Sequence, residues 1–234
     1  MSPSRAEAPD PVPSPATAAA AGRESKRRAS YHHGDLRSAL IDAAVELISE
    51  RGVSGFSLAE AGRRVGVSTA APYRHFAERE ALLAAVAIRA LTEFGTMVVG
   101  AAPPELAPAP RLAALGAAYV RFAGQNRALF ETIFAAGVDK TRYPEVNEAA
   151  APLDKVMMDG VTTLCPDDPA AAEELAKALV ALMHGFATML LDGEYTHDAD
   201  PISAASTKAA RAVTAMIAGR ASFASSAANA GCVV

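Results

Sequence analysis

The residues best suited to bind a nucleic acid lie between Ser57 and Arg79. Arg74 has no acidic residue four positions before it or three positions after it, so no ion pair with a neighbouring turn is expected. An unpaired guanidinium can donate two hydrogen bonds to the O6 and N7 atoms of guanine. Thr69 and Ala70, one turn earlier, are small enough for a helix to approach base edges closely. This pattern predicts contacts in the major groove of DNA.

Two short helices joined by a tight turn are expected to hold these side chains. The sequence Ser57-Leu-Ala-Glu60 is a capping box, in which each of the two polar side chains satisfies a backbone N–H group. Gly66 is expected to end the helix that begins there. Ser68 is expected to cap a second short helix, Thr69–His75, which tolerates Pro72 in its first turn. At the end of the first of these helices, Arg63 and Arg64 are expected to be solvated.

A supporting helix precedes this pair, with Asp35 as its N-cap and Gly52 as its C-cap. The predicted helix-turn-helix can present its second helix to a groove. A long apolar-striped helix follows from about Glu78 to Val99, and a proline-rich break is expected over residues 101–110. Further helices are predicted near residues 111–123, 126–136, 145–164, 169–192 and 201–219. The predicted fold class is all-α.

Composition excludes several other classes of protein. Two cysteines, Cys165 and Cys232, cannot form a disulfide framework or a cysteine-based zinc site. His32 and His33 have no cluster of acidic residues nearby, so neither a metal nor a cofactor is expected. No apolar run approaches the ~20 residues of a membrane-spanning helix, so no membrane partner is expected. No nucleophile with a base and an orienting group stands out, and no phosphate-binding loop is present, which argues against an enzyme.

The charge distribution favours a polyanion bound at one end of the chain. The net charge is −4 overall. Residues 23–79 contain ten Lys/Arg against seven Asp/Glu, a net of +3, whereas residues 80–234 contain eleven against seventeen, a net of −6. Residues 1–30 are predicted to form a disordered tail with a basic end. This tail is either a solvated leader or an arm that contacts DNA, and residues 221–234 are predicted to form a flexible tail.

The sequence resembles the TetR (tetracycline repressor) family of bacterial transcription regulators. The stretches that carry the resemblance are Tyr31-His-His-Gly-Asp-Leu-Arg37, Phe56-Ser-Leu58, Val65-Gly-Val-Ser-Thr-Ala-Ala-Pro-Tyr-Arg-His-Phe76 and Ala77-Glu-Arg-Glu-Ala-Leu-Leu83. The resemblance implies a helix-turn-helix DNA-binding domain at 31–80 and a helical ligand-binding and dimerisation domain at 81–220. One departure is Ala61-Gly62, where the family has a larger aliphatic residue and alanine, and looser packing is expected there.

The resemblance also implies roles for individual residues. Thr69, Ala70 and Arg74 would face bases, and Tyr73 and His75 would contact phosphates. Ser57 and Arg79 would hold the flanking DNA backbone; the spare hydroxyl of Ser57 at a helix N-terminus independently suggests an anion site. With Ser68, these residues form the predicted DNA-binding set. For Tyr73 and His75, packing within the protein is the alternative.

The C-terminal part is similar to a TetR subgroup whose domain carries a Trp-His-Gly motif. The similarity rests on residues 119–130, on His184-Gly185, which Met183 precedes in place of tryptophan, and on residues 190–193. The candidate ligand-pocket residues are Phe122, Phe130, Phe134, Met157, Met183, His184 and Phe186. For each of the apolar ones, plain core is the alternative, and for His184 a buried, hydrogen-bonded role is favoured over ligand contact. The candidate dimer-interface residues are Leu179, Phe186, Ala209, Val213 and Met216.

These features predict a homodimeric repressor in the bacterial cytoplasm, associated with the nucleoid when it is bound to DNA. Its expected partners are double-stranded operator DNA, a second copy of the chain and a small-molecule effector. An apolar or amphipathic effector would release the repressor from DNA. Two alternatives remain, a ligand-independent architectural DNA-binding protein and, less favoured, an enzyme of the helical domain.

Overall fold

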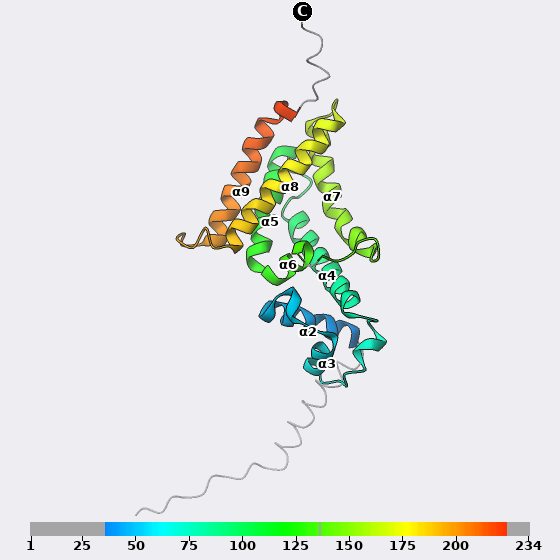
Figure 1. The fold of residues 1–234 in the computed structure, drawn as a ribbon. Helices are drawn as coiled ribbons and strands as arrows, with labels where there is room; N and C mark the ends of the chain where they lie inside the picture. The colour runs from blue at the N-terminus through cyan, green and yellow to red at the C-terminus, as the bar shows by residue number, and fades with distance from the viewer. Residues whose placement is uncertain (1–35, 136, 224–234) are drawn as a thin grey trace, which may run out of the picture.

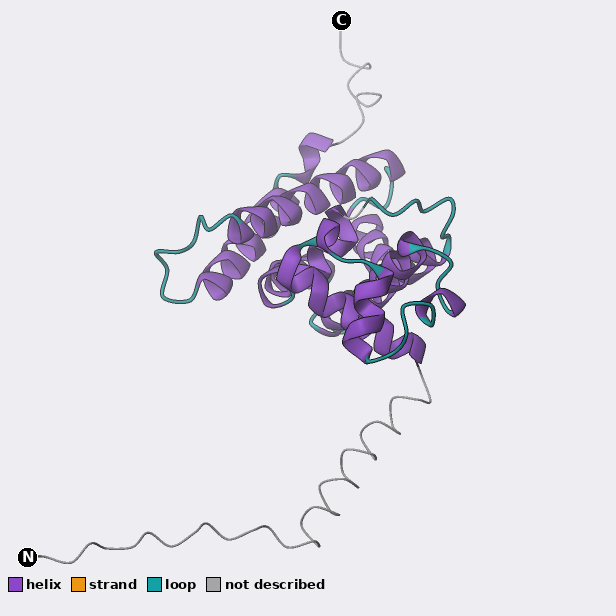
Figure 2. Ribbon diagram, turned by 60° about the horizontal axis from the view of Figure 1, so that its bottom comes forward, coloured by secondary structure: helices purple, strands orange, loops and turns teal. Residues whose placement is uncertain are grey.

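The described part of the protein is entirely helical. The computed structural model describes residues 36–135 and 137–223, and within these ranges it contains helices and loops but no strand (Figure 2). The α-helices are α2 (Leu36–Arg51), α3 (Leu58–Val65), α4 (Arg79–Gly100), α5 (Pro108–Gln125), α6 (Arg127–Ala135), α7 (Glu145–Leu164), α8 (Pro169–Leu191) and α9 (Pro201–Ala218). The 3-10 helices of the same ranges are η1 (Val53–Gly55), η2 (Pro72–Arg74) and η3 (Arg220–Phe223). The predicted all-α fold is confirmed for these residues.

The helix ends follow local capping rules. Gly52 and Gly66, which follow α2 and α3, have φ angles of 74° and 82°, in the region that favours glycine. The predicted break at 101–110 is shorter than expected, because Pro108 is the first residue of α5. A proline at that position removes no helical hydrogen bond, since the first N–H groups of a helix have no partner within it.

Several predictions fall at the ends of the chain. The tail at 1–30 and the Asp35 cap lie outside the described residues. Of the predicted C-terminal tail, only residues 221–223 are described, and they belong to η3.

α4 connects the two parts of the molecule. In Figure 1, α2 and α3 lie together at one end, α7, α8 and α9 lie toward the other, and α4 runs between them. Among the described residues, the larger of two hydrophobic clusters is continuous from Leu40 of α2 through Phe94 of α4 to Ile217 of α9. The predicted domain boundary at residue 80 therefore falls in the first turn of a helix whose side chains pack with both parts.

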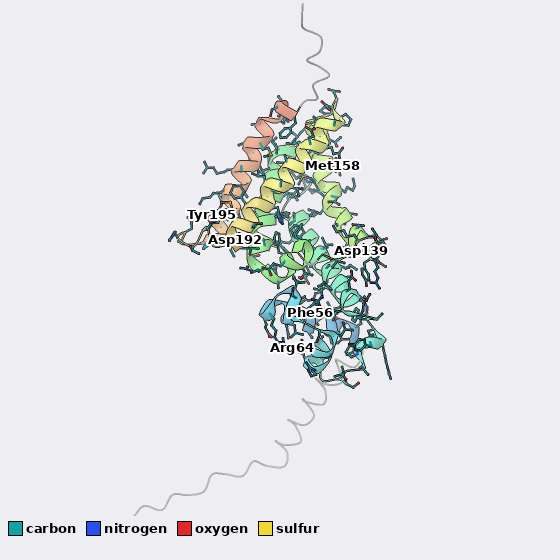
Figure 3. All side chains as sticks on the ribbon, in the orientation of Figure 1. Phe56, Arg64, Asp139, Met158, Asp192 and Tyr195 are labelled. Atoms are coloured by element: carbon teal, nitrogen blue, oxygen red, sulfur yellow. The ribbon has the colours of Figure 1, made fainter. Side chains whose placement is uncertain are left out.

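A second link joins the loop before α7 to the start of α4 (Asp139 in Figure 3). Arg142 forms an ion pair with Glu80, at 3.2 Å between Nη1 and Oε2, and a second with Glu78. The Tyr143 hydroxyl also donates to Glu78 Oε1 at 3.2 Å. These contacts attach the C-terminal helices to the end of α4 nearest the helix-turn-helix.

α4 and α8 are more apolar than expected, since no apolar run long enough to span a membrane was predicted. Both are long and apolar enough to cross a membrane, by length and composition alone. The apolar stretch of α4 is 61% buried inside the protein, as in the core helix of a globular protein, whereas that of α8 is only 28% buried. α8 therefore exposes apolar surface.

Candidate nucleic-acid interface

Ser57 caps α3, as predicted, but its hydroxyl is not spare. The Glu60 backbone N–H donates to Ser57 Oγ at 3.2 Å. The hydroxyl in turn donates to Glu60 Oε2 at 3.1 Å, so the Glu60 carboxylate meets the Ser57 side chain rather than the backbone N–H of a capping box. Arg51 donates to the other Glu60 oxygen at 2.6 Å, and these bonds hold the pKa of Glu60 below its usual range. A phosphate at this helix end would have to compete with Glu60 for the hydroxyl.

Ion pairs fix α3 against α2. Arg64 donates to both carboxylate oxygens of Glu50 at 2.8 Å and lies 3.4 Å from Glu46 (Arg64 in Figure 3). The bond to Arg64 lowers the pKa of Glu50. Both Arg63 and Arg64 are exposed, as expected of a solvated helix end, but the Arg64 guanidinium is held in ion pairs, with its side chain 28% exposed against 62% for Arg63. Arg64 is an orienting residue, because a bidentate guanidinium–carboxylate pair restrains geometry as well as distance.

The segment Ser68–Phe76, called here the recognition segment, follows the turn after α3. It is not the continuous helix predicted for Thr69–His75, because its regular part is only η2. The Ala71 N–H donates to Ser68 O at 3.1 Å, which closes a turn over Thr69 and Ala70. Pro72 has no N–H group with which to continue an α-helical pattern from Ser68. The start of the recognition segment is therefore held by a backbone hydrogen bond to the Ser68 carbonyl. No hydrogen bond of a capping kind is described for the Ser68 side chain.

The recognition segment presents one exposed surface. Pro72 and Phe76 are buried and anchor it, Phe76 being 3% exposed. The exposed residues are Ser68, Thr69, Ala70, Tyr73, Arg74 and His75. Tyr73 is 55% exposed, so about half of its surface is open to solvent. Within the described ranges Arg74 has no ion-pair partner, as its sequence context predicted.

Gly62 brings α3 into close contact with this segment. A Cβ atom at position 62 would lie 2.6 Å from Pro72 Cγ and 3.3 Å from Pro72 Cδ. The expectation that Ala61-Gly62 loosens the packing is therefore wrong, since Ala61 is fully buried and the glycine lets the proline ring approach the helix. Sequence inspection missed this contact because the two residues are ten positions apart and belong to different elements.

Arg79 links the start of α4 to the loop before α3. Its Nε donates to Phe56 O at 3.1 Å, and its Nη2 donates to Val53 O. The guanidinium carbon lies 4.5 Å from the centre of the Phe56 ring (Phe56 in Figure 3). These contacts give Arg79 a positioning role, and its predicted phosphate contact stays a prediction.

Arg79→Lys is expected to lower the free energy of unfolding by about 1–3 kcal/mol, because lysine cannot reproduce both carbonyl bonds and the stacking. Urea unfolding would measure the change. Arg74→Lys, at an exposed position, is the control and is expected to stay within about 0.5 kcal/mol of the unchanged protein. Equal stability of both variants would remove the positioning role.

Two family models match the chain. The model described as "Bacterial regulatory proteins, tetR family" matches residues 40–86, which include α3, the recognition segment and the start of α4. The model described as "Tetracyclin repressor-like, C-terminal domain" matches residues 112–209, from α5 into α9. Together they cover more than half of the sequence. The chain belongs to the TetR family. It is therefore a DNA-binding transcription regulator.

Relatives and solved structures agree with membership of the TetR family. The uncharacterized HTH-type transcriptional regulator YobS of Bacillus subtilis is 27% identical over 165 residues, which is 69% of this chain and 82% of that protein. A protein of unknown function from Rhodococcus sp. RHA1 is 32% identical, with a TM-score of 0.64 over 79% of this chain and 96% of its own. The regulator FadR from Bacillus subtilis, solved in complex with stearoyl-CoA, has a TM-score of 0.62 at 13% identity, over 76% of this chain and 98% of its own. The likeness to FadR shows a shared fold alone.

Three of the predicted pocket residues of this TetR-family protein, Phe130, Phe134 and His184, contact one another in an aromatic cluster. Phe122, Phe130, Met157 and Met183 are 2%, 3%, 7% and 2% exposed. Phe130 and Phe134 lie 4.7 Å apart between ring centres. Phe134 is 44% exposed, and Phe186 is half-buried against the core. Phe122, Phe130, Met157 and Met183 belong to the hydrophobic core, and a role for them in a ligand pocket stays a prediction.

His184 is bound within the cluster rather than facing open space. Its Nδ1 lies 3.1 Å from the Tyr119 hydroxyl, and its ring stacks on Phe130 at 5.5 Å between centres. Burial raises the pKa of Tyr119, which stays protonated. The hydrogen bond agrees with the favoured interpretation of a buried, hydrogen-bonded histidine, although His184 is only half-buried.

Three of the five predicted dimer-interface residues are buried within the protomer. Leu179, Ala209 and Val213 are 0% exposed inside one protomer, and Phe186 and Met216 are half-buried. Close packing of α5 on α9 explains the burial of Val213, since a Cβ atom at Gly116 would lie 2.9 Å from Val213 Cγ2. Apolar periodicity cannot distinguish a helix face that packs on its own chain from one that packs on a second copy.

Proposed function

We propose that the protein is a homodimeric repressor that binds operator DNA in the bacterial cytoplasm and is released by a small apolar or amphipathic molecule. The observation that carries the DNA-binding part is the exposed surface of the recognition segment. Arg74 has no ion-pair partner among the described residues, and Thr69 and Ala70 beside it are exposed and small. Buried Pro72 and Phe76 hold this surface in place, as direct contact with base edges requires.

Arg74→Ala is expected to weaken operator binding by about 1–3 kcal/mol and to relax discrimination at one base pair in each half-site, because a bidentate base contact is lost. Selection from a random DNA library would first supply the operator, and titration against single-base variants would measure the loss. Arg121→Ala is the matched control, because Arg121 is also exposed but lies on α5, remote from the recognition segment. An equal loss on every sequence would demote Arg74 to a phosphate contact.

The proposed dimer uses the exposed face of α8. Val180 and Met189 are 42% and 46% exposed, and Ala181 and Gly185 between them are exposed as well. Apolar and small side chains on a helix that is largely uncovered within its own chain favour close packing against a second copy. A two-fold dimer would place its recognition segments about 34–36 Å apart, one turn of DNA.

Release by a ligand is supported by the connection that α4 makes between the two parts of the molecule. Its first turn is tied to the loop before α7, and its core side chains pack with α5 and α6. A structural neighbour, FadR, was solved with stearoyl-CoA, so a member of this fold holds an amphipathic ligand. Linkage gives the test: if a ligand lowers DNA affinity, operator DNA must lower ligand affinity by the same factor. Equal ligand affinity with and without operator would contradict the proposed release.

A further inference from the structure

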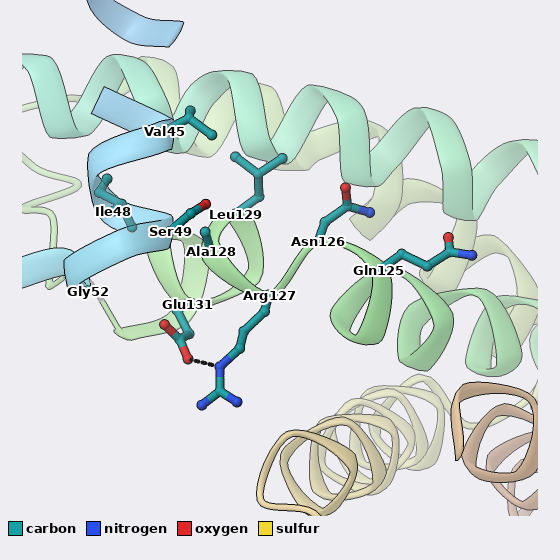
Figure 4. A pocket seen from close by; sticks show the side chains of 10 residues that line it. All are labelled: Val45, Ile48, Ser49, Gly52, Gln125, Asn126, Arg127, Ala128, Leu129 and Glu131. Carbon is teal, nitrogen blue, oxygen red and sulfur yellow. Dashed lines mark hydrogen bonds and ion pairs between the residues drawn. The ribbon is translucent and has the colours of Figure 1, made fainter. Parts of the chain in front are cut away.

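A cavity lies between α2 and the junction of α5 with α6, where the DNA-binding helices meet the C-terminal helices. Its volume is about 460 Å³, within the range of pockets that bind drug-sized molecules. Figure 4 shows α2 forming one wall and the start of α6 forming the other. The lining residues are Val45, Ile48, Ser49, Gly52, Gln125, Asn126, Arg127, Ala128, Leu129 and Glu131. This cavity is called here the seam pocket.

The chemistry of the seam pocket favours an uncharged amphipathic molecule. Val45 and Ile48 from α2, with Leu129 from α6, supply apolar surface, and Ser49 and Gln125 supply exposed hydrogen-bonding groups.

The two charged lining residues already neutralise each other. Arg127 Nε donates to Glu131 Oε1 at 2.8 Å (Figure 4), and Arg127 Nη1 donates to Leu191 O at 3.0 Å. An ionic ligand would meet no unpaired opposite charge among these residues, whereas a neutral one would lose none of these bonds.

We propose that the seam pocket binds an uncharged amphipathic small molecule and that its occupancy changes how α2 sits on α6. The regulatory half of this proposal rests on the proposed operator binding, whereas the binding half does not. The seam pocket is distinct from the aromatic cluster around Phe130 and His184, because neither residue lines it.

A molecule in the seam pocket would act on the recognition segment through the contacts that α2 makes with α3. It touches α2 and α6 at once, so its affinity depends on their separation, which is the condition for a ligand to shift a conformational equilibrium. Movement of α2 is passed to α3 by the Arg64–Glu50 and Arg51–Glu60 ion pairs. It is then passed to the recognition segment by the Gly62–Pro72 contact.

The test uses N-phenyl-1-naphthylamine, a neutral amphipathic molecule whose fluorescence rises in apolar surroundings, with the full-length protein. Ser49→Trp places a large side chain in the seam pocket from α2, and Gln125→Trp does so from the opposite wall. Ala151→Trp, at an exposed position of α7, is the matched control. Circular dichroism confirms that each variant keeps its helices. If Ser49→Trp does not fold, Gln125→Trp provides the blocked pocket. The chain has no native tryptophan, so each variant also reports its own folded environment by emission.

We expect the probe to bind the unchanged protein and the control alike, and to bind the blocking variants about tenfold or more weakly. We further expect saturating probe to weaken operator binding by about fivefold or more, the lower end of typical allosteric coupling. No binding, or equal binding to all variants, would overturn the seam pocket. Probe binding at the seam with unchanged operator affinity would overturn its regulatory half. A protein that selects no operator sequence would refute the proposed function and leave the probe result standing.

Discussion

Gly62→Ala is expected to lower operator affinity by about 100-fold, because it displaces the recognition segment. The new methyl group would lie 2.6 Å from Pro72 Cγ, and a proline ring anchored in the core cannot rotate away. Overpacking of this kind costs about 1–3 kcal/mol, and the better helix propensity of alanine returns about 1 kcal/mol, so the protein should remain folded. The loss of aligned base contacts, each worth about 1–3 kcal/mol, would be felt in both half-sites. Titration with the selected operator measures the effect.

Two companions make the test of Gly62 specific. Gly95→Ala, in α4, adds a methyl group with nothing within 4 Å and should leave operator binding unchanged. In the double variant Gly62→Ala with Pro72→Ala, the clashing Pro72 Cγ atom is absent. This variant should therefore recover part of the operator affinity. If Gly62→Ala alone keeps full operator affinity, the close contact between α3 and the recognition segment is not needed for DNA binding.

Val213→Asp is expected to unfold the protomer rather than to split a dimer. Val213 is 0% exposed and contacts the surface of α5 at Gly116. A buried carboxylate without a partner costs about 3–5 kcal/mol, a large share of the stability of a typical domain. Circular dichroism during thermal unfolding would measure the loss.

Ala181→Asp is the matched variant on α8, because Ala181 is exposed within the protomer. It should leave the helices intact and shift sedimentation toward the monomer. A folded, dimeric Val213→Asp protein would mean that α9 packs differently from the arrangement described, and a dimeric Ala181→Asp protein would move the interface away from this face of α8.

Local sequence patterns were enough to predict the order of the helices and the exposed surface of the recognition segment. The signals are local: apolar residues at helical spacing, glycine at positions 52 and 66, and a hydroxyl at Ser57. Each of these acts within one or two turns of the chain, so no tertiary contact is needed to interpret it. The same locality misled the prediction at Thr69–His75, where Pro72 shortens the regular part to one turn of 3-10 helix.

Which apolar helix faces are core and which are exposed depends on tertiary packing, and local patterns do not reveal it. Leu179 and Val180 are neighbours on α8, yet one is 0% and the other 42% exposed, because α8 packs on its own chain along one side only. The Gly62–Pro72 contact, the Arg64–Glu50 ion pair and the seam pocket likewise could not be predicted from the sequence. Each joins residues that are ten or more positions apart, and their meeting depends on how whole helices pack, which no local pattern encodes.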